Sequence, residues 1–301
     1  MIRIGVDFGG TKIEAAALAD DGRFLSRVRA PTPHDYAAAL ATVRDLVREA
    51  ARQAGVSGTR HVGVAMPGSI SSKTGVMRNA NSLWLNSMPF REDLSAALGT
   101  PVRMMNDANC LALSEANGGA AAGAAVVFAA ILGTGCGGGL AVGGRVLEGV
   151  NAIAGEWGHT PLPWPSEAEH PAPKCWCGRP GCLELYISGT GFEADYHRAT
   201  ERALAGAEIA AAARAGEREA SAALTRYIER LGRGLAVICN ILDPDVIVLG
   251  GGMSNLPELY ARVPAEIERW VFSDVLATRI VPAQHGDSSG VRGAAMLWEP
   301  A

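Results

Sequence analysis

The sequence of 301 residues lacks any apolar run long enough to cross a bilayer. The longest run, residues 120–132, is shorter than the roughly 20 residues that a membrane-spanning helix needs, and it ends at glycines. The N-terminus also lacks the layout of a signal peptide, because residues 3–7 already have the pattern of a strand. We therefore expect a cytoplasmic protein that does not engage membranes.

An excess of basic charge is missing as well. The 27 lysine and arginine residues stand against 31 acidic residues, which gives a net charge of −4 and an isoelectric point of about 5.9. Such a balance excludes a general attraction to nucleic acid. Low-complexity linkers and heptad runs are absent too, while 48% of the residues are hydrophobic. The chain can therefore bury a substantial core, which we expect to be divided between two domains.

The predicted order of elements occurs twice along the chain. A strand, a glycine-rich turn and a second strand precede further strands and helices, and the order repeats from residue 126. Strands are predicted at 3–7, 13–18, 24–30, 61–65, 102–105, 126–132, 140–142, 145–147 and 246–249, and the main helices at 36–54, 108–117 and 221–240. This repeat indicates a duplicated α/β architecture.

The first glycine-rich turn distinguishes between two α/β folds. It joins one strand to the next, whereas the phosphate turn of a Rossmann fold joins a strand to a helix. We therefore predict an actin-like (ribonuclease H-like) ATPase fold of two lobes, each with a mixed β-sheet, and with a nucleotide and sugar cleft between them. Residues 1–117 form the smaller lobe and residues 118–288 the larger, and a helix over residues 289–301 packs back onto the first lobe.

That first turn is the segment Asp7-Phe8-Gly9-Gly10-Thr11-Lys12. Gly9 and Gly10 allow phosphate oxygens to approach the backbone N–H groups, and Thr11 and Lys12 offer donors to a transferred phosphoryl group. Asp7 would help to hold Mg²⁺ through water. An ordinary hairpin turn remains an equally open alternative.

A second glycine-rich segment, Gly133-Thr134-Gly135-Cys136-Gly137-Gly138-Gly139, holds five glycines in seven residues. A structural turn rarely needs so many, which favours contact with phosphate. A third segment, Gly250-Gly251-Gly252, follows a predicted strand and is a candidate for the adenosine side of ATP. Turns from strand to helix also use glycine commonly, so this third assignment is weak on its own.

Asp107 follows a predicted strand and is the candidate general base. A sugar hydroxyl is a poor nucleophile, and a carboxylate that accepts its proton assists in-line attack on phosphorus. Local sequence alone favours the other interpretation, in which Asp107 caps the following helix. The neighbouring Asn106 can contact a sugar hydroxyl or stabilise a turn.

Further polar residues suit a sugar, whose hydroxyl groups need paired donors and acceptors. Glu156 and His159 lie three residues apart, although a surface turn would place them equally well. Gly68, Asn79 and Asn81 are weaker candidates, because each is equally plausible as turn chemistry.

Three of the six cysteines, Cys175, Cys177 and Cys182, lie close together in the sequence. With His159 they offer a closed tetrahedral set for structural zinc, although the spacing is not that of a C-x2-C finger. Buried free thiols are the alternative. A bound zinc would tie the segment at Glu156 to the cysteine loop that leads to Glu184, and would organise a sugar pocket without taking part in the chemistry.

Taken together, these motifs resemble the ROK family of bacterial sugar kinases over essentially the whole chain. The segments that carry the resemblance are 7–12, 106–107, 133–139, 156–159 and 175–184. The resemblance implies that Asp107 is the catalytic base and that Asn106, Glu156, His159 and Glu184 contact the sugar. It also implies zinc bound by His159, Cys175, Cys177 and Cys182, Mg-ATP as the phosphoryl donor, and a homodimer.

Within this family the sequence most resembles the fructokinase type that also accepts mannose, on segments such as 67–71, 79–82, 161–164 and 187–192. We therefore expect ATP-dependent phosphorylation of the 6-hydroxyl of fructose, with mannose and glucose as secondary substrates. The alternative is an N-acetylglucosamine or N-acetylmannosamine kinase. A sugar-responsive regulator is disfavoured, because the first strand begins at Arg3 and leaves no room for a helix-turn-helix.

Overall fold

The computed structural model describes residues 2–56, 61–80 and 82–298. Its internal contacts divide the chain into two units. The first comprises Met1–Ala122, Arg145–Ala154 and Asp287–Ala301, and the second comprises Gly123–Gly144 and Gly155–Gly286. Three segments that the sequence assigned to the larger lobe group with the first unit instead: residues 118–122, Arg145–Ala154 and residues 287–288. The division at residues 117 and 118 stays a prediction.

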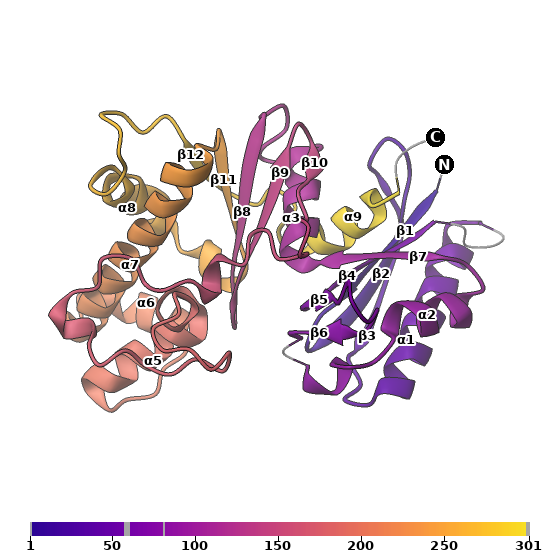
Figure 1. Ribbon diagram of the computed structural model, residues 1–301, viewed down its shortest axis with the longest axis horizontal. Coiled ribbons are helices and arrows are strands. Elements are labelled where there is room, and N and C mark those ends of the chain that lie inside the picture. Colours follow the sequence, from indigo (N-terminus) through magenta and orange to yellow (C-terminus); the bar gives the residue numbers. More distant parts are fainter. Residues whose placement is uncertain (1, 57–60, 81, 299–301) are drawn as a thin grey trace. The chain divides into compact units, whose positions relative to one another are not determined.

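The first unit is built on a five-stranded mixed sheet (Figure 1). Its strands run in the order β3-β2-β1-β4-β7. The hairpins β1–β2 and β2–β3 are antiparallel, whereas β4 is parallel to both β1 and β7. The bounds are β1 (Arg3–Phe8), β2 (Lys12–Leu18), β3 (Phe24–Pro31), β4 (Val62–Met66) and β7 (Val102–Asn106).

The two faces of this sheet differ because alternate residues of a strand point to opposite sides. On β1, the buried side chains of Ile4, Val6 and Phe8 join the core beneath helices α1 (Tyr36–Gln53) and α2 (Phe90–Leu98). On the other face, Gly5 and Gly63 are paired across β1 and β4, and a Cβ atom at either would clash with a backbone carbonyl of helix α9 (Ser289–Met296). Both glycines therefore allow α9 to pack directly on the sheet.

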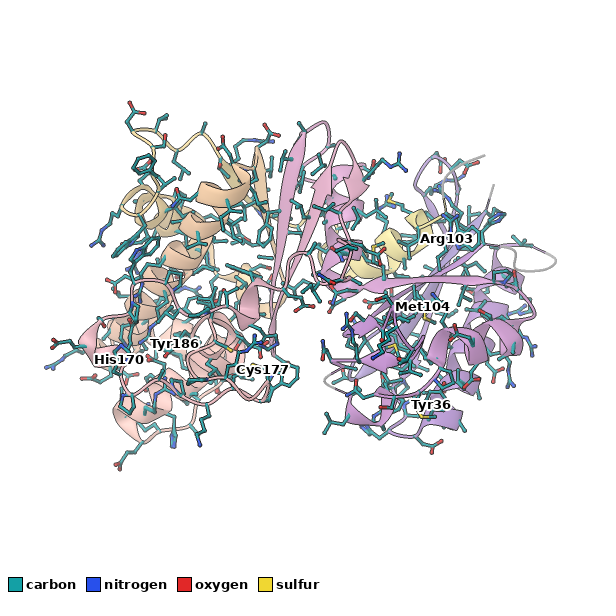
Figure 2. The ribbon with its side chains drawn as sticks, viewed as in Figure 1. Tyr36, Arg103, Met104, His170, Cys177 and Tyr186 are labelled. Carbon is teal, nitrogen blue, oxygen red and sulfur yellow. The ribbon has the colours of Figure 1, made fainter. Side chains whose placement is uncertain are left out.

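Four helices accompany this sheet: α1 (Tyr36–Gln53), α2 (Phe90–Leu98), α3 (Asp107–Ala116) and α9 (Ser289–Met296). The α9 helix comes from the C-terminal end of the chain and contacts β1, β4 and α3. Beside it, the Arg103 guanidinium lies over the Trp298 ring, 4.3 Å from its centroid, and Figure 2 labels this arginine on β7. The smaller elements of the unit are β5 (Ser69–Ile70), β6 (Met77–Arg78), η1 (Leu83–Leu85) and η5 (Gly286–Ser288).

The second unit repeats the sheet topology of the first. Its strands run in the order β9-β8-β11-β12, with an antiparallel β8–β9 hairpin and parallel β8–β11 and β11–β12 pairs. The bounds are β8 (Val126–Leu132), β9 (Cys136–Val142), β11 (Val246–Gly250) and β12 (Arg279–Pro282), while β10 (Arg145–Val146) belongs to the segment that groups with the first unit. The duplicated α/β architecture predicted from the sequence is confirmed.

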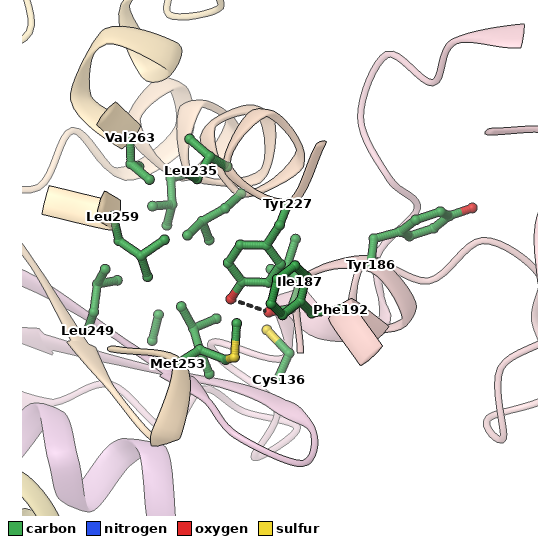
Figure 3. Close-up of a cluster of buried hydrophobic side chains, with 14 of the residues drawn as sticks. Cys136, Tyr186, Ile187, Phe192, Tyr227, Leu235, Leu249, Met253, Leu259 and Val263 are labelled. Carbon is green, nitrogen blue, oxygen red and sulfur yellow. Dashed lines mark hydrogen bonds between the residues drawn. The ribbon is translucent and has the colours of Figure 1, made fainter. Parts of the chain in front are cut away.

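The core of the second unit lies between its sheet and the long helix α7 (Arg218–Leu242). Tyr227 is fully buried in it and donates its hydroxyl to the carbonyl of Ile187 at 2.8 Å (Figure 3). This hydrogen bond satisfies the one polar atom that the phenol brings into the core. The other elements are η2 (Trp157–His159), η3 (Glu167–Glu169), α4 (Glu184–Ile187), α5 (Gly189–Thr200), α6 (Gly206–Arg214), η4 (Gly252–Asn255) and α8 (Pro257–Glu268).

The second glycine segment differs from its prediction. The bend covers only residues 133–135, because β9 begins at Cys136 and pairs with β8 through Gly137, Gly138 and Gly139. A side chain at Gly138 would clash with the carbonyl of Gly155, so close packing explains this glycine within a strand. Within the described ranges, the structure holds no helix with the length and apolar character that spanning a membrane requires.

Candidate active site and metal centre

The first glycine turn closes the β1–β2 hairpin. Gly9 donates its N–H to the carbonyl of Lys12 at 3.0 Å and accepts a hydrogen bond from the Thr32 hydroxyl at 2.7 Å. A Cβ atom at Gly9 would lie 2.8 Å from the Lys12 carbonyl oxygen, so the hairpin itself explains this glycine. Gly10 is different: it is exposed, its φ lies outside the left-handed region, and a Cβ atom would meet nothing within 4 Å. Its open backbone is what an approaching phosphate requires.

Asp7 lies at the end of β1, on the face of the sheet that α9 covers. A Cβ atom at Gly290 would lie 2.8 Å from one Asp7 carboxylate oxygen. The carboxylate therefore faces the first turn of α9, where the absence of a side chain leaves room for it. Exposed Thr11 and half-buried Lys12 complete the turn.

Asn106 and Asp107 have different positions and roles at the start of α3. Asn106 is the N-cap, and its side-chain oxygen accepts from the backbone N–H of Ala108 at 2.9 Å and of Asn109 at 3.4 Å. Asp107 is the first helical residue, and its carboxylate oxygen Oδ1 also accepts from the N–H of Ala108, at 2.8 Å. The cap position that sequence reasoning offered as the alternative role for Asp107 is thus held by its neighbour.

Gly68 and Asn79 both adopt left-handed backbone conformations, with φ of 72° and 58°. A side chain at Gly68 would clash with the carbonyl of Arg78, so turn geometry accounts for this glycine. The Asn106 side-chain nitrogen lies 3.5 Å from the Gly68 carbonyl and can donate to it. Asn81 lies outside the described residues.

A cavity of about 340 Å³ in the first unit includes Asn106 in its lining. Asn109 also lines it, although only 6% of this residue is exposed. The Asn109 side-chain oxygen finds no hydrogen-bond partner among the described residues. An unsatisfied acceptor buried against a cavity costs free energy unless a ligand or water supplies a donor. Sequence reasoning missed Asn109. The signal that could have identified it is its position in the first turn of α3, two residues after Asp107.

In the second unit, the bend at residues 133–135 is held by the neighbouring helix α5. The carbonyl of Gly133 accepts from the N–H of Gly189 at 2.7 Å, and the carbonyl of Thr134 accepts from the hydroxyl of Thr190 at 2.7 Å. At Gly133 a Cβ atom would meet only Ile131, at 4.0 Å. The backbone of this bend is therefore fixed and open on one side.

The third segment begins at Gly250, the last residue of β11. Gly251 has a φ of 81°, and a Cβ atom there would lie 2.6 Å from the backbone of Leu132. Conformation and packing both require this glycine. At Gly252 a Cβ atom would meet nothing within 4 Å, so its backbone is open as at Gly10.

Glu184 connects the second glycine segment to the cysteine loop. Its carboxylate oxygen Oε2 accepts from the backbone N–H of Cys136 at 2.9 Å, and Oε1 accepts from the indole N–H of Trp176 at 2.8 Å. A Cβ atom at Gly135 would lie 2.8 Å from Oε2, which explains the glycine at this position. Sequence reasoning missed Trp176, although its place between two candidate metal ligands was a signal.

Glu156 immediately precedes the short helix η2, and His159 is its last residue. Between them, buried Trp157 donates its indole N–H to the carbonyl of Gly137 at 3.0 Å. At Gly158 a side chain would clash with the carbonyl of Cys136. The segment is therefore anchored to β9, and this anchoring fixes the backbone on either side of Trp157.

His159, Cys175, Cys177 and Cys182 form one cluster, whose candidate ligand atoms all lie within 4.8 Å of one another. Cys177 Sγ lies 3.4 Å from Cys182 Sγ, and Cys175 Sγ lies 3.7 Å from His159 Nδ1. Zinc–sulfur bonds of about 2.3 Å at tetrahedral angles place sulfur atoms roughly 3.8 Å apart. Three thiols and one imidazole at these separations fit structural zinc. Figure 2 labels Cys177 in this loop.

The surroundings of the three thiols shift their pKa values in different directions. Burial raises the pKa of Cys182 to about 12 and also raises that of Cys175. The backbone N–H of Arg179 lowers the pKa of Cys177. A bound cation compensates for the burial of thiolates, because it stabilises the charged form. The cysteines outside the cluster, Cys110, Cys136 and Cys239, are buried, and burial raises the pKa of each thiol.

Comparison with known proteins places the chain in a family. The model of the ROK family matches residues 3–301. An N-acetyl-D-glucosamine kinase of Salmonella paratyphi C is 40% identical over 298 residues, which cover 97% of this chain and 98% of that protein.

Solved structures of ROK family proteins also superpose on this chain. The crystal structure of a ROK hexokinase from Thermus thermophilus superposes with a TM-score of 0.86 at 34% identity, covering 98% of this chain and 97% of that one. A ROK family glucokinase from Streptomyces griseus, solved with glucose and AMPPNP, gives a TM-score of 0.82 at 28% identity, with 99% of each chain covered. The actin-like fold predicted from the sequence is confirmed. The chain belongs to the ROK family and is one of its ATP-dependent sugar kinases.

Proposed function

We propose that this kinase transfers the γ-phosphoryl group of Mg-ATP to the 6-hydroxyl of N-acetyl-D-glucosamine. The observation that carries the proposal is the 40% identity, over nearly the full length of both chains, to a protein named N-acetyl-D-glucosamine kinase. The alternative substrate class that the sequence offered thus replaces fructose as the main proposal, because the relatives do not support fructose specifically.

Asp107 is assigned the role of general base. It accepts the proton of the attacking sugar hydroxyl as the new phosphorus–oxygen bond forms. The geometry of α3 supports this role, since Asn106 provides the N-cap and the Asp107 carboxylate stands at the helix N-terminus.

The open glycines are assigned to ATP. Gly10 lies at an exposed backbone position where phosphate oxygens can approach, and Gly252 offers the same opening beside β11. Gly133 leaves one side of its bend open, although its own N–H donates to the carbonyl of Gly135 at 3.1 Å. Thr11 and Lys12 are assigned to the transferred phosphoryl group. Mg²⁺, when bound, neutralises charge on the phosphates, and Asp7 is the residue that would hold it.

The sugar is assigned to Asn106, Glu156, His159 and Glu184. Asn109 adds an argument for an acetamido substituent, because its buried oxygen finds no donor among the described residues and an acetamido N–H is such a donor. His159 and the three cysteines would hold zinc, which keeps the η2 segment and the cysteine loop in one arrangement.

A plain hexose is the second candidate, favoured by the similarity to a ROK hexokinase. The deciding experiment compares ATP-coupled kcat/KM for N-acetylglucosamine, N-acetylmannosamine, glucose, mannose and fructose. We expect N-acetylglucosamine to exceed fructose by about tenfold or more, because a site built to pair a polar substituent rejects sugars without it. A higher kcat/KM for fructose or glucose would overturn the proposed substrate.

A further inference from the structure

Trp176 joins the cysteine loop to the acid assigned to the sugar. It lies between Cys175 and Cys177, and its ring meets the His159 ring edge-on, with centroids 4.9 Å apart and planes at 85°. Its indole N–H donates to Glu184 Oε1 at 2.8 Å. One side chain therefore contacts both a candidate zinc ligand and Glu184.

The Glu184 carboxylate is held from two sides. Oε1 accepts from Trp176, and Oε2 accepts from the backbone N–H of Cys136 at the start of β9. Each carboxylate oxygen can accept two hydrogen bonds, so each keeps one lone pair for a ligand hydroxyl. Two donors that arrive from different segments restrict the rotation of the carboxylate before a sugar binds, which reduces the ordering cost of binding.

Packing alone does not explain a tryptophan at this position. The residue is 60% exposed, so most of its apolar surface gains little from burial. What the indole contributes beyond a smaller aromatic ring is its N–H donor. The donor reaches a charged acceptor, which makes the hydrogen bond stronger than one between neutral groups.

We propose that Trp176 is a positioning residue for the sugar: its N–H fixes the orientation of the Glu184 carboxylate and so sets the affinity for the acceptor. This inference rests on the proposed function, in which Glu184 contacts the sugar. The cysteine loop would then contribute to substrate recognition through Trp176, in addition to supplying the candidate zinc ligands.

The test replaces Trp176 by phenylalanine, which keeps an aromatic ring against His159 and removes the donor. Trp176→Tyr restores a donor, and Trp164→Phe is the matched control, because Trp164 is a half-exposed tryptophan of the same unit that stacks on Trp270. Steady-state kinetics give KM for sugar and for ATP separately, and metal analysis gives zinc per chain. We expect Trp176→Phe to raise the KM for the sugar about tenfold, with little change in KM for ATP or zinc content.

A second readout does not depend on turnover. Sugar titration followed by tryptophan fluorescence should show a change in emission in the wild type and in Trp164→Phe that is reduced in Trp176→Phe. Partial recovery of the sugar KM in Trp176→Tyr supports the donor role. An unchanged sugar KM in Trp176→Phe overturns the inference, and so does a loss of zinc that accounts for the whole defect. Wild-type protein that phosphorylates none of the sugars overturns the proposed function instead.

Discussion

At the scale of single residues, the start of α3 shows how two adjacent polar side chains take different tasks. Asn106 satisfies the N–H groups that the helix leaves unpaired, whereas Asp107 points its charge at the same helix end without being needed as the cap. Local sequence could not separate the two, because aspartate and asparagine are both good N-caps. The structure separates them by their positions, one before the helix and one within it.

The first prediction follows from this difference in role between Asn106 and Asp107. Asp107→Asn keeps the shape of the side chain and removes its ability to accept a proton, so we expect kcat to fall by about 10² to 10⁴. Sugar affinity and the free energy of unfolding should change little, since Asn106 still caps the helix. Coupled-assay kinetics and chemical denaturation provide the measurements. Asp45→Asn, at an exposed site on α1, is the matched control, and turnover of Asp107→Asn close to that of this control would remove Asp107 from the catalytic role.

At the scale of elements, a buried ion-pair network joins three parts of the second unit. Glu169 at the end of η3 accepts from Arg230 at 2.8 Å and from Arg233 at 2.5 Å, both on α7. Arg230 also donates to Asp195 of α5 at 2.7 Å. The side chains of Glu169 and both arginines are at most 8% exposed. Breaking one partner of such a network leaves buried charge without compensation.

The network predicts how the free energy of unfolding falls at acidic pH. Burial raises the pKa of Glu169, but hydrogen bonds from Arg233 and Arg230 outweigh it and lower the pKa to about 2. A folded-state pKa below the unfolded value of 4.5 means that the unfolded chain binds more protons between these limits. The stabilisation is therefore complete above about pH 4.5 and is lost as the pH falls toward 2. Its size is on the order of 3 kcal/mol.

Glu169→Gln tests this account. The variant should lose about that free energy of unfolding at pH 7, and its stability should depend less on pH between 4.5 and 2 than that of the wild type. Denaturant unfolding at a series of pH values provides the measurement. Glu167→Gln, at an exposed residue of the same short helix, should match the wild type. Equal acid sensitivity in Glu169→Gln and the wild type would contradict the assigned pKa.

Sequence patterns predicted the order of strands well, because alternating and continuous apolar runs reflect burial directly. These patterns failed to explain glycines that are required by close packing against a segment distant in the sequence. Gly138 was expected in a turn but lies in β9, where it faces Gly155 and Trp157. Gly5 and Gly63 carried no visible signal, since their reason is the backbone of α9, hundreds of residues later in the chain.

At the scale of the whole molecule, two sheets of the same topology carry the functional residues in equivalent places. In each, the first antiparallel hairpin ends in a glycine turn with an open backbone position, at Gly10 and at Gly133. The duplication was predictable because the motifs recur in the same order. The substrate was not, because single side chains decide it: Asn109 lies outside every segment that the sequence singled out, and Trp176 lies between two candidate zinc ligands without having been assigned a role.

The metal cluster supplies the last prediction. Its four ligands come from η2 and from the loop before α4, so zinc would join two segments that both lead to sugar-assigned residues, Glu156 and Glu184. We expect about one zinc per chain, and we expect its removal by a strong chelator to lower the melting temperature and raise the KM for the sugar. The cause would be the loss of a cross-link that fixes both segments. Cys177→Ser should reproduce both effects, whereas Cys239→Ser, at a buried thiol outside the cluster, should keep the zinc. Active protein that contains no zinc would exclude the metal and leave the four side chains as a hydrogen-bonded group of free thiols and imidazole.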